Sequence, residues 1–316
     1  MRHTIFTPTY NRIKTLPRVY ESLKKQTYKE FIWLIIDDGS NDGTRELAEE
    51  WKKEAQLSIN YFYKKNGGKH TAFQMALEIV TTKYITTIDS DDILLPNALE
   101  VLDKAWKKIE ADNLENSIAQ VQGFTIYETG ELVGYGNFSL NPNILHIDAS
   151  WHELVLKNKC LRELVGACNV EKLKECIDFN KYTWKKKHLR YLGESIFWSS
   201  IGRKYKTRLL NNIFRIYYLD GGDSLLRTKK NRDRYINEMV NCYYFIEEND
   251  FKFLFYYPYY YISQVAKFTI IGIHIGESFN SQFKIIKNKK FKYIYALSYP
   301  LAYIFHKCTH PKRILD

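Results

Sequence analysis

The sequence predicts an α/β fold built on a mostly parallel, doubly wound sheet, with a helical, aromatic and basic extension at its C-terminal end. Strand-like and helix-like segments alternate over the first 130 residues, as in a sheet with crossover helices. Residues 31–36 (FIWLII) form a continuous apolar run, typical of a strand buried on both faces. The composition, 45% hydrophobic and 26% charged, is sufficient for a packed core.

Four strands alternate with four helices in this part of the chain. We expect the strands at 4–7, 31–36, 59–63 and 84–88, and a helix after each of them. The first helix is indicated by Leu16, Val19, Tyr20 and Leu23, which share one face at helical spacing. The same periodicity predicts a helix over 44–55 and a third helix on which Phe73, Ala76, Leu77 and Val80 share a face, and Pro96 marks the beginning of the fourth.

Each expected strand is followed by a polar or glycine-rich cluster. The clusters are Thr7-Pro8-Thr9-Tyr10-Asn11-Arg12, Asp37-Asp38-Gly39-Ser40, Asn66-Gly67-Gly68-Lys69 and Asp89-Ser90-Asp91-Asp92. In open α/β sheets, ligands bind outside the carboxyl ends of the parallel strands. We therefore expect the four clusters to form one binding site at this edge of the sheet.

The last cluster places three carboxylates within four residues, at Asp89, Asp91 and Asp92. Carboxylate oxygens bind Mg²⁺ or Mn²⁺ alongside substrate phosphates, and they also cap helices, so the residues alone leave both interpretations open. The sequence has no G-x-G-x-x-G after its first strand, no P-loop and no G-x-S-x-G. The sequence therefore lacks the motifs that would indicate a dehydrogenase, a P-loop enzyme or an α/β-hydrolase.

Taken in order, the four clusters resemble the motifs of family 2 glycosyltransferases. The resemblance covers about residues 3–130, and residues 190–225 more loosely. It implies a GT-A fold (a Rossmann-like sheet), a nucleotide-sugar donor, a Mn²⁺ or Mg²⁺ cofactor, and inversion at the anomeric carbon of a transferred hexose.

The resemblance also implies roles for individual residues. The nucleotide-sugar would be bound by Thr7, Pro8, Tyr10, Arg12, Asp38, Gly68, Lys69, Asp89 and Ser90. Tyr10 would lie against the nucleobase, and Asp38 would accept a hydrogen bond from it, which favours the ring N–H of uracil and hence a UDP-sugar. Asp91 and Asp89 would bind the metal. Ordinary packing for Tyr10 and a turn for Asp38 are the alternatives.

An inverting transfer needs a base for the acceptor hydroxyl. In the family this base is usually the Asp of a Glu-Asp pair, whereas this chain has Glu194-Ser195, so Glu194 is the candidate. A first-turn glutamate beside a helix dipole is its alternative. The segment Asp220-Gly221-Gly222-Asp223-Ser224 resembles a loop that closes over the donor, and Arg227, Lys229 and Lys230 follow it as candidate diphosphate ligands.

The charge is unevenly distributed along the chain. Residues 203–316 hold 20 Lys and Arg against 9 Asp and Glu, which accounts for the whole net charge of +11. We expect a catalytic domain over 1–225, with a donor half at 1–130 and an acceptor half at 131–225. A helical region over 226–316 would associate with an anionic membrane surface.

No targeting segment or spanning helix is evident, and the five cysteines form no C-x-x-C pair. We therefore expect a cytoplasmic enzyme attached to the inner face of the cell membrane. Its acceptor would be a lipid-linked saccharide in surface polysaccharide or lipopolysaccharide assembly.

Two other functions are considered. A metal-dependent nucleotidyltransferase acting on sugar phosphates would also need paired carboxylates and a base pocket. A nucleic-acid-binding protein would suit the basic C-terminal part. The second is disfavoured, because the acidic clusters repel phosphodiesters, and we expect no nucleic-acid partner.

Overall fold

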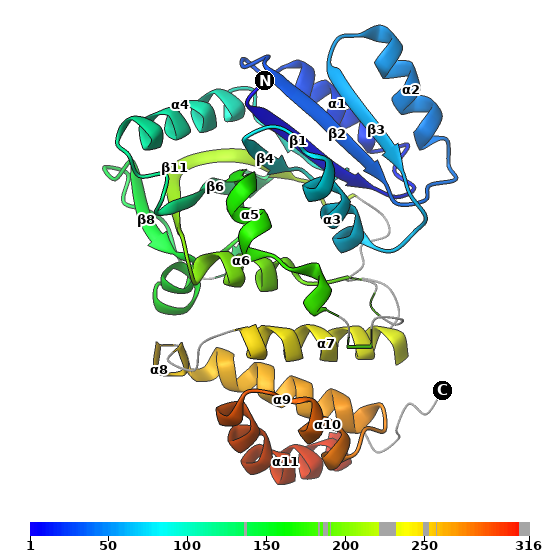
Figure 1. The fold of residues 1–316 in the computed structure, drawn as a ribbon, viewed down its shortest axis with the longest axis vertical. Helices are drawn as coiled ribbons and strands as arrows, with labels where there is room; N and C mark the ends of the chain where they lie inside the picture. The colour runs from blue at the N-terminus through cyan, green and yellow to red at the C-terminus, as the bar shows by residue number, and fades with distance from the viewer. Residues whose placement is uncertain are drawn as a thin grey trace. The chain divides into compact units, whose positions relative to one another are not determined.

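The computed structural model describes residues 1–135, 138–182, 184–185, 189, 191–220, 232–248, 253–256 and 258–309 (Figure 1). The chain divides into two compact units. One comprises Met1–Ile177 with Ile201–Ser224, and the other comprises Asp178–Ser200 with Leu225–Asp316.

A mixed sheet forms the centre of the first unit. In the described residues it has nine strands, in the order β3 (Ser58–Tyr63), β2 (Phe31–Asp37), β1 (His3–Thr9), β4 (Tyr84–Thr87), β10 (Leu164–Asn169), β6 (Ile118–Tyr127), β11 (Lys206–Tyr217) and β5 (Ile93–Leu94), with β8 (His146–Ser150) paired to β11. The first four strands in this order are parallel to one another. Strand β10 is antiparallel to both of its neighbours, and β6 and β11 are parallel. The predicted α/β class is confirmed.

Helices cover both faces of the parallel half. They are α1 (Leu16–Lys24), α2 (Thr44–Glu54) and α4 (Ala98–Ala111) on one face, and α3 (Lys69–Ile79) on the other (Figure 1). Ile5 and Phe6 are neighbours in β1 and both are fully buried, because successive strand side chains point to opposite faces. Phe6 packs toward Phe73 of α3, with the ring centres 6.1 Å apart. The sheet is therefore doubly wound.

The core on the α1 side is stabilised by aromatic stacking. The Tyr20 ring lies 4.4 Å from that of Trp51 and is nearly parallel to it. The Tyr84 ring lies 4.3 Å from that of Trp106 in the same way. Such pairs add about 0.5–1.5 kcal/mol each beyond their apolar burial.

Two strands are longer than the sequence suggests. Strand β1 runs to Thr9 rather than to residue 7, because its pairing with β2 continues to Thr9 and Asp37. The sequence also predicts a strand over 211–218, and the observed strand β11 begins five residues earlier, at Lys206, where its first residues pair with β8. Both extensions depend on a neighbouring strand, which local sequence does not reveal.

The second unit is helical. Its larger elements are α7 (Arg232–Glu248), α8 (Phe253–Tyr256), α9 (Pro258–His274), α10 (Phe279–Ile285) and α11 (Lys289–Thr309). Helix α9 packs against both α7 and α11. The core is aromatic: Phe268 has the rings of Tyr243, Phe291 and Tyr295 within 6.2 Å of its own. The predicted helical, aromatic extension is confirmed.

Among the described helices, none is both long enough and apolar enough to cross a bilayer.

Candidate functional site

The loops after β1 and β2 are tied together at the carboxyl edge of the sheet. The backbone N–H of Asn11 donates to Ser40 Oγ over 2.8 Å, and Asn11 Oδ1 accepts from the N–H of Asn41 over 2.9 Å. The N–H of Asp38 donates to the carbonyl of Thr9 over 2.8 Å. The first two sequence clusters therefore lie side by side, as expected from their positions at the ends of adjacent parallel strands.

Asp38 joins the third cluster to the second. Its buried carboxylate accepts hydrogen bonds from the N–H groups of Gly67 (2.9 Å) and Gly68 (2.7 Å), and Lys64 Nζ lies 2.5 Å from it. Gly68 has a positive φ of 92°, which lets the chain turn directly into α3. Asp38 thus shapes the glycine-rich loop, and its contact with a nucleobase stays a prediction.

Asp37 has an internal role. It is fully buried, and its carboxylate accepts hydrogen bonds from the N–H of Ser40 and the hydroxyl of Tyr61. Burial and this hydrogen bond raise the pKa of the Tyr61 phenol. Asp37 therefore fixes the turn that presents Asp38.

Lys69 and Asp89 join the third cluster to the fourth. Lys69 is the first residue of α3, and its Nζ lies 2.6 Å from Asp89 Oδ1. Burial opposes ionisation of Asp89, but the positive charges of Lys69 and Arg215 outweigh it and lower the pKa of the carboxyl. Asp89 is therefore ionised at neutral pH.

Asp91 and Asp92 differ in their surroundings. Arg12 Nη2 lies 3.9 Å from Asp91 Oδ2, and burial together with the negative charge of Asp89 raises the Asp91 pKa. Asp92 is fully buried, and burial raises its pKa to about 7. Its Oδ1 accepts the N–H of Tyr218 over 3.2 Å. Asp92 therefore anchors the segment after β11 rather than facing solvent.

Arg215 is a buried cation behind the acidic cluster. It projects from β11, with Nη1 3.5 Å from Asp92 and 3.9 Å from Asp89, and Nη2 2.8 Å from Glu163. Arg215 belongs to none of the four sequence clusters. One signal was available: an arginine within the apolar strand 211–218 needs a buried acidic partner.

Arg18 connects α1 to the fourth cluster and to the segment after β11. Its Nη1 donates to the carbonyl of Asp91 over 3.0 Å, and its guanidinium pairs with Asp220. It also lies 3.8 Å from the centre of the Tyr218 ring. This arginine was also missed, because its position on an amphipathic helix suggests an ordinary exposed charge. The predicted loop residues 221–224 and Arg227, Lys229 and Lys230 lie outside the described residues.

The remaining predicted donor contacts differ in exposure. Tyr10 is 49% exposed at the edge, while Ser90 is buried. Thr7 and Pro8 are buried within β1, and the Thr7 hydroxyl accepts the indole N–H of Trp33 over 3.0 Å. Their contacts with a nucleotide-sugar stay predictions.

The acidic cluster suits a divalent cation that takes part of its ligands from the protein and the rest from a substrate. Asp89 and Asp91 supply hard oxygen donors, and a cation between them would relieve the repulsion that raises the Asp91 pKa. Among the described residues, no group of three or more His, Cys, Asp or Glu could hold a metal by itself. Two carboxylates suit Mg²⁺ or Mn²⁺, which typically takes its other ligands from water and substrate phosphates.

Glu194 belongs to the second unit. It is the first residue of α6 (Glu194–Gly202), and its side chain is exposed. The residues before it are held by two asparagines of α7. Asn237 exchanges two hydrogen bonds with the backbone of Tyr191, and Asn241 Oδ1 accepts the N–H of Gly193. The position of Glu194 is thus set by α7, and its role as a base stays a prediction.

The first part of the chain is similar to known glycosyltransferase sequences. The model of the family described as glycosyl transferase family 2 matches residues 4–129. Glycosyltransferase GlyG of Streptococcus pneumoniae is 30% identical over 132 residues, which are 40% of this chain and 44% of GlyG. An uncharacterized glycosyltransferase of Rickettsia felis is 40% identical over 98 residues, 31% of this chain and 16% of that protein. The chain therefore spans less than half of these relatives.

Solved structures resemble this one in fold. S. aureus TarS 1–349 in complex with UDP-GlcNAc aligns with a TM-score of 0.54 and 15% identity, over 94% of this chain and 79% of that one. The mannosyltransferase PcManGT from Pyrobaculum calidifontis, in complex with GDP-Man and Mn²⁺, aligns with a TM-score of 0.50 and 13% identity, over 98% and 88% of the two chains. At these identities the likeness shows the GT-A fold alone.

Proposed function

Residues 4–129 of this chain belong to glycosyl transferase family 2, and on this premise we propose that the protein transfers a sugar from a nucleotide-sugar donor to a saccharide acceptor. The observation that carries the proposal is the meeting of Lys69 with Asp89 and of Arg12 with Asp91 at the strand ends. Alternating cations and carboxylates suit a diphosphate held together with a divalent metal.

The donor is a UDP-sugar in this proposal. The exposed Tyr10 ring stacks on uracil, and Lys69 and Arg12 contact the diphosphate. Asp91 and Asp89 hold Mn²⁺ or Mg²⁺, which when bound neutralises charge on the leaving diphosphate. Arg215 lies 3.9 Å from Asp89, and together with Lys69 it lowers the pKa of that carboxyl.

The transfer inverts the anomeric carbon, with Glu194 as the base. Glu194 accepts the proton of the acceptor hydroxyl while the hydroxyl oxygen attacks the sugar carbon and the nucleoside diphosphate leaves. No pair of acids is required for this step, because one carboxylate can accept the proton. Ser195 in place of the second acid is compatible with this assignment.

The acceptor is a lipid-linked saccharide at an anionic membrane surface. Helix α11 exposes Tyr293, Leu297, Leu301, Ile304 and Phe305, which recur at helical spacing on one face. Residues 278–309 contain six lysines and no acidic residue. An apolar helix face flanked by lysines suits the interface of an anionic bilayer. Residues 1–225 would then be catalytic, and 226–316 would attach the enzyme to the membrane.

Incubation with a panel of nucleotide-sugars tests the reaction. The protein is mixed with each donor and Mn²⁺, with and without a lipid-linked saccharide, and products are identified by mass. We expect a mass increase of one sugar on the acceptor, with release of the nucleoside diphosphate. Consumption of a sugar phosphate and a nucleoside triphosphate instead would identify a nucleotidyltransferase.

A further inference from the structure

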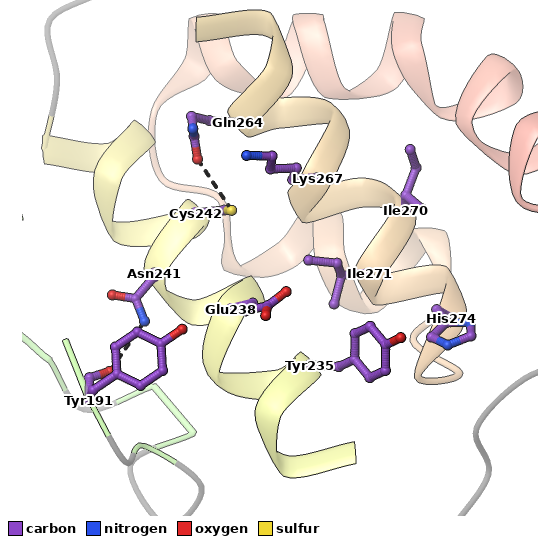
Figure 2. Close-up of a pocket in the computed structure, with 10 residues that line it drawn as sticks. All are labelled: Tyr191, Tyr235, Glu238, Asn241, Cys242, Gln264, Lys267, Ile270, Ile271 and His274. Atoms are coloured by element: carbon purple, nitrogen blue, oxygen red, sulfur yellow. Dashed lines mark hydrogen bonds between the residues drawn. The ribbon is translucent and has the colours of Figure 1, made fainter. Parts of the chain in front are cut away.

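The helical unit contains a cavity of about 560 Å³ (Figure 2). It lies between α7 and α9, with Tyr191 at one end. Tyr235 and Glu238 line it from α7, and Lys267 and Ile271 line it from α9. Its volume lies within the range typical of small-molecule sites, about 300–1,000 Å³. The sequence motifs did not point to this cavity.

The cavity wall is hydrogen-bonded to the residues that precede Glu194. Asn241, which lines the cavity, donates from Nδ2 to the carbonyl of Tyr191 over 3.2 Å and accepts the N–H of Gly193 at Oδ1. Buried Asn237 accepts the N–H of Tyr191 over 3.0 Å and donates to its carbonyl over 2.9 Å. The cavity and the segment directly before Glu194 therefore share Tyr191 and Asn241.

The lining combines aromatic rings with hydrogen-bonding side chains. Tyr191 and Tyr235 offer ring faces that can pack against the C–H face of a sugar ring. Glu238 accepts a hydrogen bond from Arg234 over 3.3 Å and has further acceptor capacity, and Lys267 on α9 is a donor, so hydroxyl groups can be bound from both sides of the cavity. Several polar groups in the lining disfavour a purely apolar chain. A neutral saccharide matches this set.

Gln264 is held in place at the edge of the cavity. The thiol of Cys242 donates to Gln264 Oε1 over 3.4 Å (Figure 2). Burial raises the Cys242 pKa to about 12, so the sulfur remains a neutral thiol donor at physiological pH. The Gln264 amide is thus oriented by Cys242.

We propose that this cavity binds the saccharide part of the acceptor, away from the hydroxyl that reacts. The inference rests on the proposed function, because it takes Glu194 as the group that meets the reacting hydroxyl. A base must lie beside the acceptor, and the hydrogen bonds of Asn241 connect this cavity to the residue before that base. The cavity would then select acceptors by the sugars that precede the reacting one.

Two tryptophan substitutions on the same helix test this inference. Ile271→Trp fills the cavity from α9, and Ile262→Trp adds the same side chain at an exposed position of α9 outside the lining. Lys267→Ala, at an exposed residue, is a third variant that removes a hydrogen-bond donor with little risk to folding. The probe is a printed array of bacterial oligosaccharides, followed by calorimetric titration of the one that wild type retains best.

We expect Ile271→Trp and Lys267→Ala to weaken oligosaccharide binding at least tenfold, and Ile262→Trp to change it less than twofold. Affinity for UDP with Mn²⁺ should stay within twofold of wild type in all three. Wild type that retains no oligosaccharide, or Ile271→Trp that binds as wild type does, would overturn the inference. Wild type that binds oligosaccharide in this cavity but no UDP would contradict the proposed function and leave the saccharide site standing.

Discussion

Asn241 of α7 accepts a hydrogen bond from the backbone N–H of Gly193, the residue directly before Glu194. The two partners lie 48 positions apart in the chain, so a helix of the C-terminal region positions the candidate base. Asn241 also lies close to the Gly193 backbone, since a Cβ atom added at Gly193 would be 3.2 Å from Asn241 Oδ1. The candidate base and the proposed acceptor cavity are therefore joined by the hydrogen bonds of Asn241.

Asn241→Ala should lower kcat for transfer about tenfold to a hundredfold while leaving the KM for the donor unchanged. The alanine removes the acceptor of the Gly193 N–H, and a misplacement of about 1 Å at a reacting group can cost a hundredfold in rate. Asn241→Asp keeps that acceptor oxygen and should retain more of the rate. Steady-state kinetics of the two variants checks this, and equal kcat values for Asn241→Ala and wild type would contradict it.

Glu194→Gln should lower the transfer rate by about 10²–10⁴-fold, the usual contribution of a positioned base. The amide keeps the shape of the side chain but cannot accept the proton. UDP affinity should be nearly unchanged. Glu171→Gln is the matched control, since Glu171 is an exposed glutamate in the first turn of α5 (Val170–Cys176). Transfer at the wild-type rate in Glu194→Gln would place the base elsewhere.

Leu297→Gln should weaken binding to vesicles that contain anionic lipid. Leu297 is 80% exposed at the centre of the apolar face of α11, and inserting a leucine side chain contributes about 1.5–3 kcal/mol when its burial is complete. Leu145→Gln is the control, because Leu145 is equally exposed but lies in the first unit. Vesicle co-sedimentation that falls equally in both variants, or in neither, would argue against this face.

Glu110 should make the fold sensitive to acid. Its carboxylate bonds with Arg2, Lys83 and Tyr84, and these contacts outweigh burial and lower its pKa from 4.5 to about 2. A lowered pKa stabilises the folded state above pH 4.5, and this contribution is lost as the pH falls toward 2.

Glu110→Gln should therefore lower the free energy of unfolding at pH 7 by about 1–2 kcal/mol, with the full linkage value reduced for partial exposure. The loss should shrink as the pH approaches 2. Urea denaturation at pH 7 and at pH 3 measures both effects. Glu115→Gln, which removes a contact to Lys83 alone, should have a smaller effect. An equal loss at both pH values would count against this assignment.

The sequence predicted the part of the site that depends on strand ends. The polar clusters at Asp38, Lys69 and Asp89 follow strands that local periodicity identifies, and parallel strands bring their carboxyl ends to one edge. This is why the four clusters could be expected to meet. The contacts among them, such as Asp38 with Gly67 and Gly68, depend on loop geometry that residue types alone do not determine.

The residues that the sequence did not indicate contact partners that lie far away along the chain. Arg18 pairs with Asp220, 202 positions away, and no local pattern links the two. Arg215 could have been noticed as a charge in an apolar strand, but its partners at Asp92 and Glu163 depend on the antiparallel additions to the sheet. Asn237 and Asn241 are ordinary polar residues of a helix in the sequence, and only the folded chain brings them to the backbone of Tyr191 and Gly193.

In the proposed mechanism, the carboxylates after β4 would hold a metal that binds the donor diphosphate. Isothermal titration with UDP, with and without Mn²⁺, tests it most directly in wild type and in Asp91→Ala. We predict that Mn²⁺ strengthens UDP binding at least tenfold in wild type and has no effect in Asp91→Ala. UDP binding that depends equally on Mn²⁺ in both proteins, or on Mn²⁺ in neither, would contradict a metal site at Asp91.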